Sequence, residues 1–238
     1  MGNEIVHIFV GSDRKQFTIH KKLLCTYSNF FEKAFNGGFK EATEDKMDLP
    51  DDDPLIFNAL VEWLYSHKRH RTIKNTSYLE GVDSLIDLYI FGEKIDCNGL
   101  KNTSMDELQD LLDDEDITLL TLSHMSRIFE NTLSTTDPIR RFCAAIISFD
   151  IMYAHRYPTS ELHAFFLKLP DALRAYLDFT LNFEKVGIRT VGGDPRQRWE
   201  HAKFSQCYFH SHNLEEECDT TITYPRDDDD LDVDICYD

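Results

Sequence analysis

Apolar and polar residues alternate along three short stretches of the N-terminal half. Ile5 to Val10 and Gln16 to His20 each place apolar side chains on one face of an extended chain, and the intervening Gly11-Ser-Asp-Arg is typical of a turn. Lys46 to Pro50 repeats the alternation until its proline, which cannot donate to a strand ladder. The pattern predicts a β-hairpin and a third short strand.

Helical spacing of apolar residues fills most of what remains of the first 112 residues. Ser28 is placed to cap one helix, and Asp53-Pro54 pairs an N-cap residue with a proline at the first helical position. Residues 66–81 are polar and basic, which predicts a solvated loop. The predicted helices cover residues 23–28, 29–36, 54–64, 82–95 and 98–112.

Beyond the acidic run Asp113-Asp-Glu-Asp116 the pattern is purely helical. Asp137-Pro138 repeats the cap-and-proline signal, and Thr159 or Ser160 is placed to cap a later helix. Periodicity fades from Gly192, apart from a patch around residues 199–212 that either folds or belongs to the tail. The predicted helices cover residues 119–133, 139–155, 160–169 and 170–186. We therefore expect a mixed domain at 1–112, a helical extension at 113–193, and an acidic, partly disordered tail at 194–238.

Composition narrows the classes of protein to which the chain can belong. Apolar residues make up 42% of its 238 residues and charged residues 29%, as in an ordinary globular protein. No apolar run is long enough to span a bilayer and no secretory leader opens the sequence, so the six cysteines are expected to be reduced thiols in the cytoplasm or nucleus. The net charge of −18 disfavours binding to nucleic acid. No phosphate-binding, hydrolase or metalloprotease motif occurs, so neither an enzyme nor a cofactor is expected.

The N-terminal half resembles the BTB/POZ domain. The resemblance runs through HIFVGSDRKQFTIHKKLLCTYSNFFEKAFNGGFKEATEDKMDLPDDDPLIFNALVEWLYSHK and the later DLYIFGEKIDCNGLK. It implies an α+β fold with a small three-stranded sheet flanked by a helical cluster, followed here by an all-α extension. DPIRRFCAAIISFD and CYFHSH are similar to the extension of short fungal BTB proteins. The matching positions are Phe17, His20, Leu23, Leu24, Ser28, Phe30, Phe31, Phe39, Glu41, Pro54, Trp63, Leu64 and Tyr65.

The sequence departs from the family pattern at its first strand. Ile5 stands where the family usually has an aspartate, and the neighbouring acid, Glu4, is one residue out of register. A shift of one residue along a strand puts a side chain on the opposite face of the sheet. About four residues precede this strand, so the N-terminal helix that dimeric members exchange is not expected. The resemblance does not imply homodimerisation through that element.

The resemblance also implies a site. An apolar-x-Glu segment at the position of Phe39-Lys40-Glu41 docks the cullin scaffold of ubiquitin ligases, and Phe35 and Tyr65 are expected to line the same surface. The alternative is that Phe39 covers the core and Glu41 is merely solvated. His20 ends a strand and is expected to bond local backbone rather than take part in catalysis.

Cys207, His210, His212 and Cys218 have the donor types of a tetrahedral zinc site. Their spacing is not that of a common zinc finger, and the two histidines would point to opposite sides of an extended chain. The alternative is a surface segment with incidental donors. Two functions remain open for the whole chain: an adaptor that binds a ubiquitin-ligase scaffold, or a self-assembling scaffold protein that degrades nothing.

Overall fold

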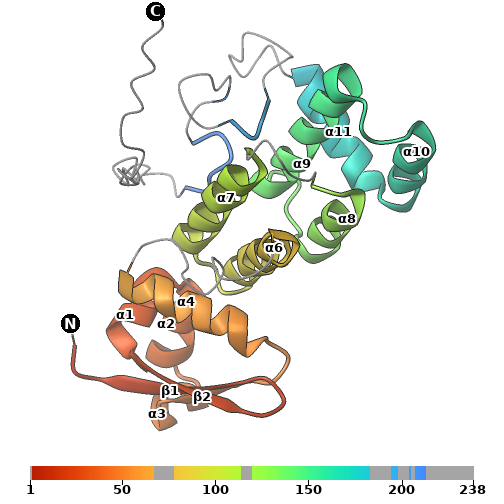
Figure 1. The fold of residues 1–238 in the computed structure, drawn as a ribbon. Coiled ribbons are helices and arrows are strands. Elements are labelled where there is room, and N and C mark those ends of the chain that lie inside the picture. Colours follow the sequence, from red (N-terminus) through yellow and green to blue (C-terminus); the bar gives the residue numbers. More distant parts are fainter. Residues whose placement is uncertain are drawn as a thin grey trace, which may run out of the picture.

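The alternating stretches form a three-stranded sheet in the computed structural model (Figure 1). Strand β1 (Ile5–Val10) pairs antiparallel with β2 (Lys15–His20) and parallel with β3 (Lys46–Leu49), which gives the order β2-β1-β3. Val6, Ile8 and Val10 are fully buried, so the predicted inward face of β1 is confirmed. The structure describes residues 2–66, 78–113, 120–182, 194–197, 204 and 207–212. Most of the basic loop, most of the acidic run at 113–116, the charged segment 213–238 and Cys218 lie outside these ranges.

Four of the described helices flank the sheet in the N-terminal lobe. Ser28 accepts a hydrogen bond from the backbone N–H of Phe31 at 3.2 Å, and its own hydroxyl donates to the carbonyl of Ile95 at 2.6 Å. Ser28 therefore caps its helix as predicted and also ties that corner to a distant turn. Asp53 accepts from the N–H of Leu55, as an N-cap residue should. The helices are α1 (Lys21–Tyr27), α2 (Asn29–Asn36), α3 (Lys40–Glu44) and α4 (Pro54–Ser66).

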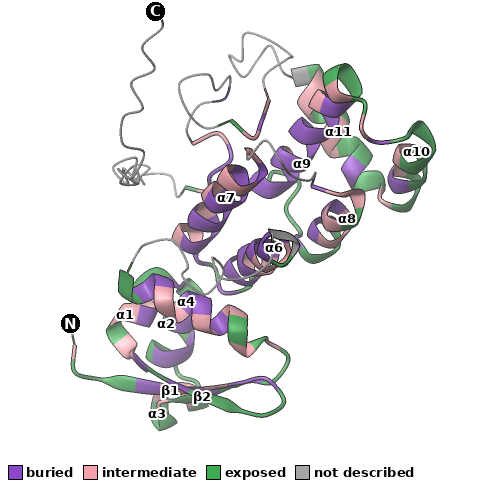
Figure 2. Ribbon diagram, viewed as in Figure 1, coloured by how far each residue is buried: buried purple, intermediate pink, exposed green. Residues whose placement is uncertain are grey.

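Helices α6 (Tyr78–Lys94) and α7 (Asn98–Asp113) form an antiparallel pair between the two lobes (Figure 1). Each helix contributes to two hydrophobic cores, and Figure 2 shows buried residues along both. Leu88 and Leu100 belong to the core between the sheet and its helices, whereas Ile86 and Leu108 belong to the core of the C-terminal lobe. The proposed boundary near residue 112 thus follows a helix pair that both lobes share.

Helices make up most of the C-terminal lobe in the part of the chain that the structure describes. The predicted helix over 139–155 is in two parts, because α9 (Pro138–Phe149) continues as the π-helical turn η1 (Asp150–Ala154) and ends at His155 in the left-handed region. Pro158 occupies the N-cap position that was predicted for Thr159 or Ser160. No helix among the described residues is long and apolar enough to cross a membrane. The remaining helices are α8 (Leu122–Asn131), α10 (Thr159–Lys168) and α11 (Pro170–Asn182).

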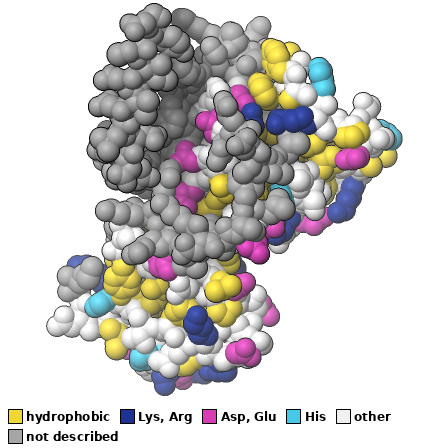
Figure 3. Space-filling view, viewed as in Figure 1, with side chains coloured by type: hydrophobic (Ala, Val, Ile, Leu, Met, Phe, Trp, Pro, Cys, Tyr) yellow, Lys and Arg dark blue, Asp and Glu magenta, His cyan; other side chains and the backbone are white. Residues whose placement is uncertain are grey.

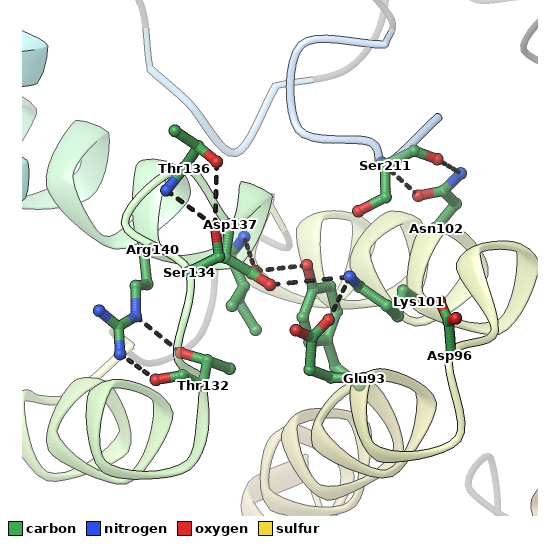
Figure 4. A network of polar contacts seen from close by, with 12 residues as sticks. Glu93, Asp96, Lys101, Asn102, Thr132, Ser134, Thr136, Asp137, Arg140 and Ser211 are labelled. Atoms are coloured by element: carbon green, nitrogen blue, oxygen red, sulfur yellow. Dashed lines mark hydrogen bonds and ion pairs between the residues drawn. The ribbon is translucent and has the colours of Figure 1, made fainter. Parts of the chain in front are cut away.

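A buried polar network joins α6, α7 and α9 (Figure 4). Lys101 of α7 forms ion pairs with Glu93 of α6 at 2.5 Å and with Asp137 at 3.6 Å. Asp137 also accepts from the hydroxyl of Tyr89 at 2.7 Å and caps α9 through the N–H of Ile139 at 3.1 Å. The cap predicted from Asp137-Pro138 is therefore also the point where the extension is attached to the N-terminal lobe.

Candidate functional site

Phe39 stands at the start of α3 with 62% of its surface exposed. Its ring lies over Gly37, where an added Cβ would sit 3.1 Å from the ring and 2.3 Å from the carbonyl oxygen of Lys33. Gly37 is thus required by close approach to the end of α2, and it gives the Phe39 ring a flat support. The side chain does not cover the core, which removes one alternative for this residue.

Glu41 follows Phe39 in the first turn of α3 and is half-buried. Lys40 and Glu44 form an i,i+4 ion pair at 3.6 Å on the same helix. Among the described residues, the Glu41 carboxylate has no hydrogen bond or ion pair of its own. An exposed aromatic ring and an unpaired acid therefore stand two residues apart on one short helix.

Tyr65 lies near the end of α4 and is 44% exposed. Its hydroxyl accepts from the backbone N–H of His20 at 3.3 Å and lies 2.7 Å from Nδ1 of the same residue. Through this pair of contacts, His20 joins the end of β2 to the end of α4. The expectation of a bond to local backbone was wrong, because the ring partner is a side chain 45 residues away.

Phe35 does not belong to the expected surface. It is only 1% exposed and stacks on Phe31 with ring centroids 6.3 Å apart, so it supports α2 from within the core. Its assignment to the surface is corrected on this ground. Phe39 and Tyr65 are both exposed, and that they line one surface stays a prediction.

Comparison with known families supports the architecture. Residues 5–92 match the family model of the BTB/POZ domain. The chain carries a BTB/POZ domain. This domain is a protein–protein interaction module, and its matched residues end inside α6, so α7 and the helices after it lie beyond the match. No curated protein matches the chain significantly.

The BTB/POZ domain presents other large apolar side chains besides the two expected ones, and Figure 3 shows hydrophobic side chains on the outer face of this lobe. Phe30 belongs to the apolar stretch of α2 that includes Phe31 and Phe35, yet 36% of it is exposed. Periodicity could not detect this, because three phenylalanines in one short helix leave the edge of the apolar face undefined. The exposed members are Ile5, Tyr27, Phe30, Phe39, Leu55 and Tyr65.

A surface depression of about 520 Å³ lies near the N-terminus. Its lining includes Lys21, Cys25 and Glu32. Burial raises the pKa of the Cys25 thiol, against a smaller opposing effect of Lys21. The thiol donates to the carbonyl of Phe31 at 3.6 Å. Cys25 is therefore held as a protonated thiol, which is the unreactive form.

Three of the four zinc-type donors come together. Cys207, His210 and His212 each place one ligand atom within 4.8 Å of the others. Residues 207–209 form a turn, closed by a hydrogen bond from the N–H of His210 to the carbonyl of Cys207 at 3.1 Å. The expectation that the histidines diverge is corrected, because one ligand atom of each lies within 4.8 Å of the other. Cys218 lies outside the described residues.

Proposed function

We propose that the BTB/POZ domain docks a cullin scaffold through Phe39-Lys40-Glu41, and that the chain acts in the cytoplasm or nucleus as an adaptor of a ubiquitin ligase. The observation that carries the proposal is the exposed Phe39 ring, supported by Gly37 and followed by the unpaired Glu41. Interface hot spots combine such a pre-positioned apolar anchor with a charge that fixes orientation.

Burial of the Phe39 ring in a partner's pocket would supply about 1.5–3 kcal/mol. Phe39→Ala should therefore weaken cullin binding by roughly 30-fold, since about 1.4 kcal/mol corresponds to a tenfold change. Glu41→Lys should weaken it as well, because the acid becomes a repelling or misplaced cation. The domain should remain folded in both variants, because Phe39 is outside the core and Glu41 lacks internal partners.

The test is a binding titration of purified protein against the N-terminal region of a cullin. Leu55→Ala is the matched control for Phe39→Ala, because Leu55 is equally exposed but lies on α4. Glu44→Lys makes the same change of charge on α3 as Glu41→Lys. No binding by the unaltered chain overturns the proposal. If a variant and its control lose the same amount of cullin affinity, the cullin does not contact the Phe39-Lys40-Glu41 segment.

An adaptor must also hold its target, and helices α7 to α11 lie beyond the BTB/POZ match. We assign target recruitment to this extension. Affinity purification of the unaltered chain and of Glu41→Lys, followed by mass spectrometry, separates the two roles: the variant should lose the ligase scaffold and keep the target.

Self-assembly without degradation is the second candidate. Leu173, Leu177 and Leu181 recur every four residues on α11 and all are exposed, as in helices that pack against a copy of themselves. Light scattering behind size exclusion would reveal a dimer, and Leu177→Glu should dissociate it. A monomer at micromolar concentration counts against this alternative, whereas a dimer that binds no cullin favours it over the adaptor.

A further inference from the structure

The Cys207–His212 segment is anchored to the folded body at several points. Phe209 is buried in the C-terminal core, with its ring 5.2 Å from that of Phe142. Asn102 of α7 donates from its amide to the carbonyl of Ser211 at 3.0 Å and accepts from the N–H of Ser211 at 2.8 Å (Figure 4). The donor side chains therefore project from a backbone that is fixed on both sides.

His210 has the second contact that metal-binding histidines typically make. It is buried, and its Nε2 lies 2.7 Å from a carboxylate oxygen of Asp106 on α7. A carboxylate that accepts a hydrogen bond from one ring N–H fixes the tautomer and the orientation of the ring. With Nε2 directed at Asp106, Nδ1 is the nitrogen that would ligate. The His212 ring stands at 5.8 Å from the His210 ring, measured between centroids.

We propose that Cys207, His210 and His212 bind one zinc ion, which fastens this C-terminal segment to α7. One thiolate and two imidazoles are ligands that zinc prefers and that magnesium and calcium do not. The Cys207 thiol gives its proton to solvent on binding, and water fills the fourth position of the tetrahedron. The role that we assign to the ion is structural, because His210 is held by Asp106 and the ion would tie Cys207 and His212 to the same place on α7.

The separation of the donors suits this ion. Zinc–nitrogen and zinc–sulfur bonds of about 2.0–2.3 Å in a tetrahedron put ligand atoms roughly 3.5 Å apart. One ligand atom from each of the three residues already lies within 4.8 Å of the others, so modest side-chain rotations bring the donors to this separation. Cys207 is only half-buried, which leaves a path for the ion to enter.

The test uses the full chain, stripped of metal and then dialysed against zinc chloride. Elemental analysis should find one zinc per chain, and Cys207→Ser and His212→Ala should each lose it. Cys25→Ser and His155→Ala are matched controls, because they remove a thiol and an imidazole outside the cluster. Cobalt bound to the unaltered chain in place of zinc should give the visible spectrum of a tetrahedral site with a thiolate ligand. This measurement does not depend on whether any variant folds.

Asp106→Asn separates a metal site from an incidental cluster. Loss of the carboxylate should weaken zinc binding by about 10–100-fold in a competition titration while one ion still binds at saturation. Zinc should also raise the unfolding temperature of the unaltered chain, and a chelator should reverse this. Zinc content below one per chain, or content that Cys207→Ser and His212→Ala leave unchanged, overturns the proposal.

Discussion

His124 forms an uncommon kind of capping box at the start of α8. Its backbone N–H donates to the hydroxyl oxygen of Thr121, and its Nδ1 accepts from the N–H of Thr121, both at 3.2 Å. Glutamate or glutamine usually takes this place. Burial lowers the pKa of His124 below its ordinary 6.5, with Asp83 acting in the opposite direction and Arg127 in the same direction. The structure thus favours the neutral ring, which the cap requires.

This gives the folded protein a dependence on pH of known sign. Because the folded-state pKa is lowered, the unfolded chain binds a proton first as pH falls below 6.5, and the stability that the neutral ring confers is lost there. His124→Gln keeps an acceptor for the Thr121 N–H but does not titrate. Between about pH 7.5 and about pH 5, the unfolding temperature of the unaltered chain should fall more than that of this variant. Parallel curves would contradict the assignment.

Single residues could be predicted from sequence where their partners are local. Ser28, Asp53 and Asp137 were expected to cap helices, and each does, because a cap bonds a backbone N–H only two or three residues ahead. His20 was expected to bond local backbone, yet its ring meets Tyr65. Nothing in the spacing of apolar residues reports which side chains meet across 45 positions.

At the scale of elements, the sequence predicted the strands and most helices. It did not predict the short helix α3 or the π-helical turn η1, both of which end at a residue with positive φ. The short helix α3 was not predicted, because five residues show too little periodicity. It ends at Asp45, whose φ of 51° turns the chain into β3. The conversion of α9 into η1 was also missed. Buried Asp150 accepts from the N–H groups of Arg156 and Tyr157, so a tertiary turn sets the end of that helix.

The network around Asp137 should determine how firmly α9 is attached. Asp137→Ala removes the acceptor of the Tyr89 hydroxyl, the cap of α9 and one partner of buried Lys101. Breaking a buried ion pair on one side costs about 3–5 kcal/mol. Urea unfolding should therefore show a loss of this order for Asp137→Ala.

Two variants separate the parts of that network. Tyr89→Phe removes one hydrogen bond and should cost about 1–2 kcal/mol. Asp137→Asn keeps the cap on the N–H of Ile139 but not the charge beside Lys101, so its loss should lie between the other two. If Asp137→Ala costs no more than an ordinary exposed cap, about 1 kcal/mol, the network does not hold the lobes together.

Across the whole molecule, α6 and α7 make the two lobes depend on each other. A fragment of residues 1–112 keeps the sheet and the side of α6 and α7 that packs in the N-terminal core. It also uncovers seven buried side chains of the C-terminal core. They are Val82, Leu85, Ile86, Tyr89, Met105, Leu108 and Leu112.

The fragment should therefore be much less stable than the full chain. Each uncovered side chain forfeits about 1.5–3 kcal/mol of burial, and together they match or exceed the 5–15 kcal/mol of stability that a typical domain has in total. We expect the purified fragment to aggregate on size exclusion or to lack a cooperative urea transition. Polar replacements at Val82, Ile86 and Leu108 should improve its solubility, since they make the uncovered face hydrophilic. A monomeric fragment with the urea midpoint of the full chain would instead establish that the BTB/POZ lobe folds alone, and that the shared helices do not couple the two cores.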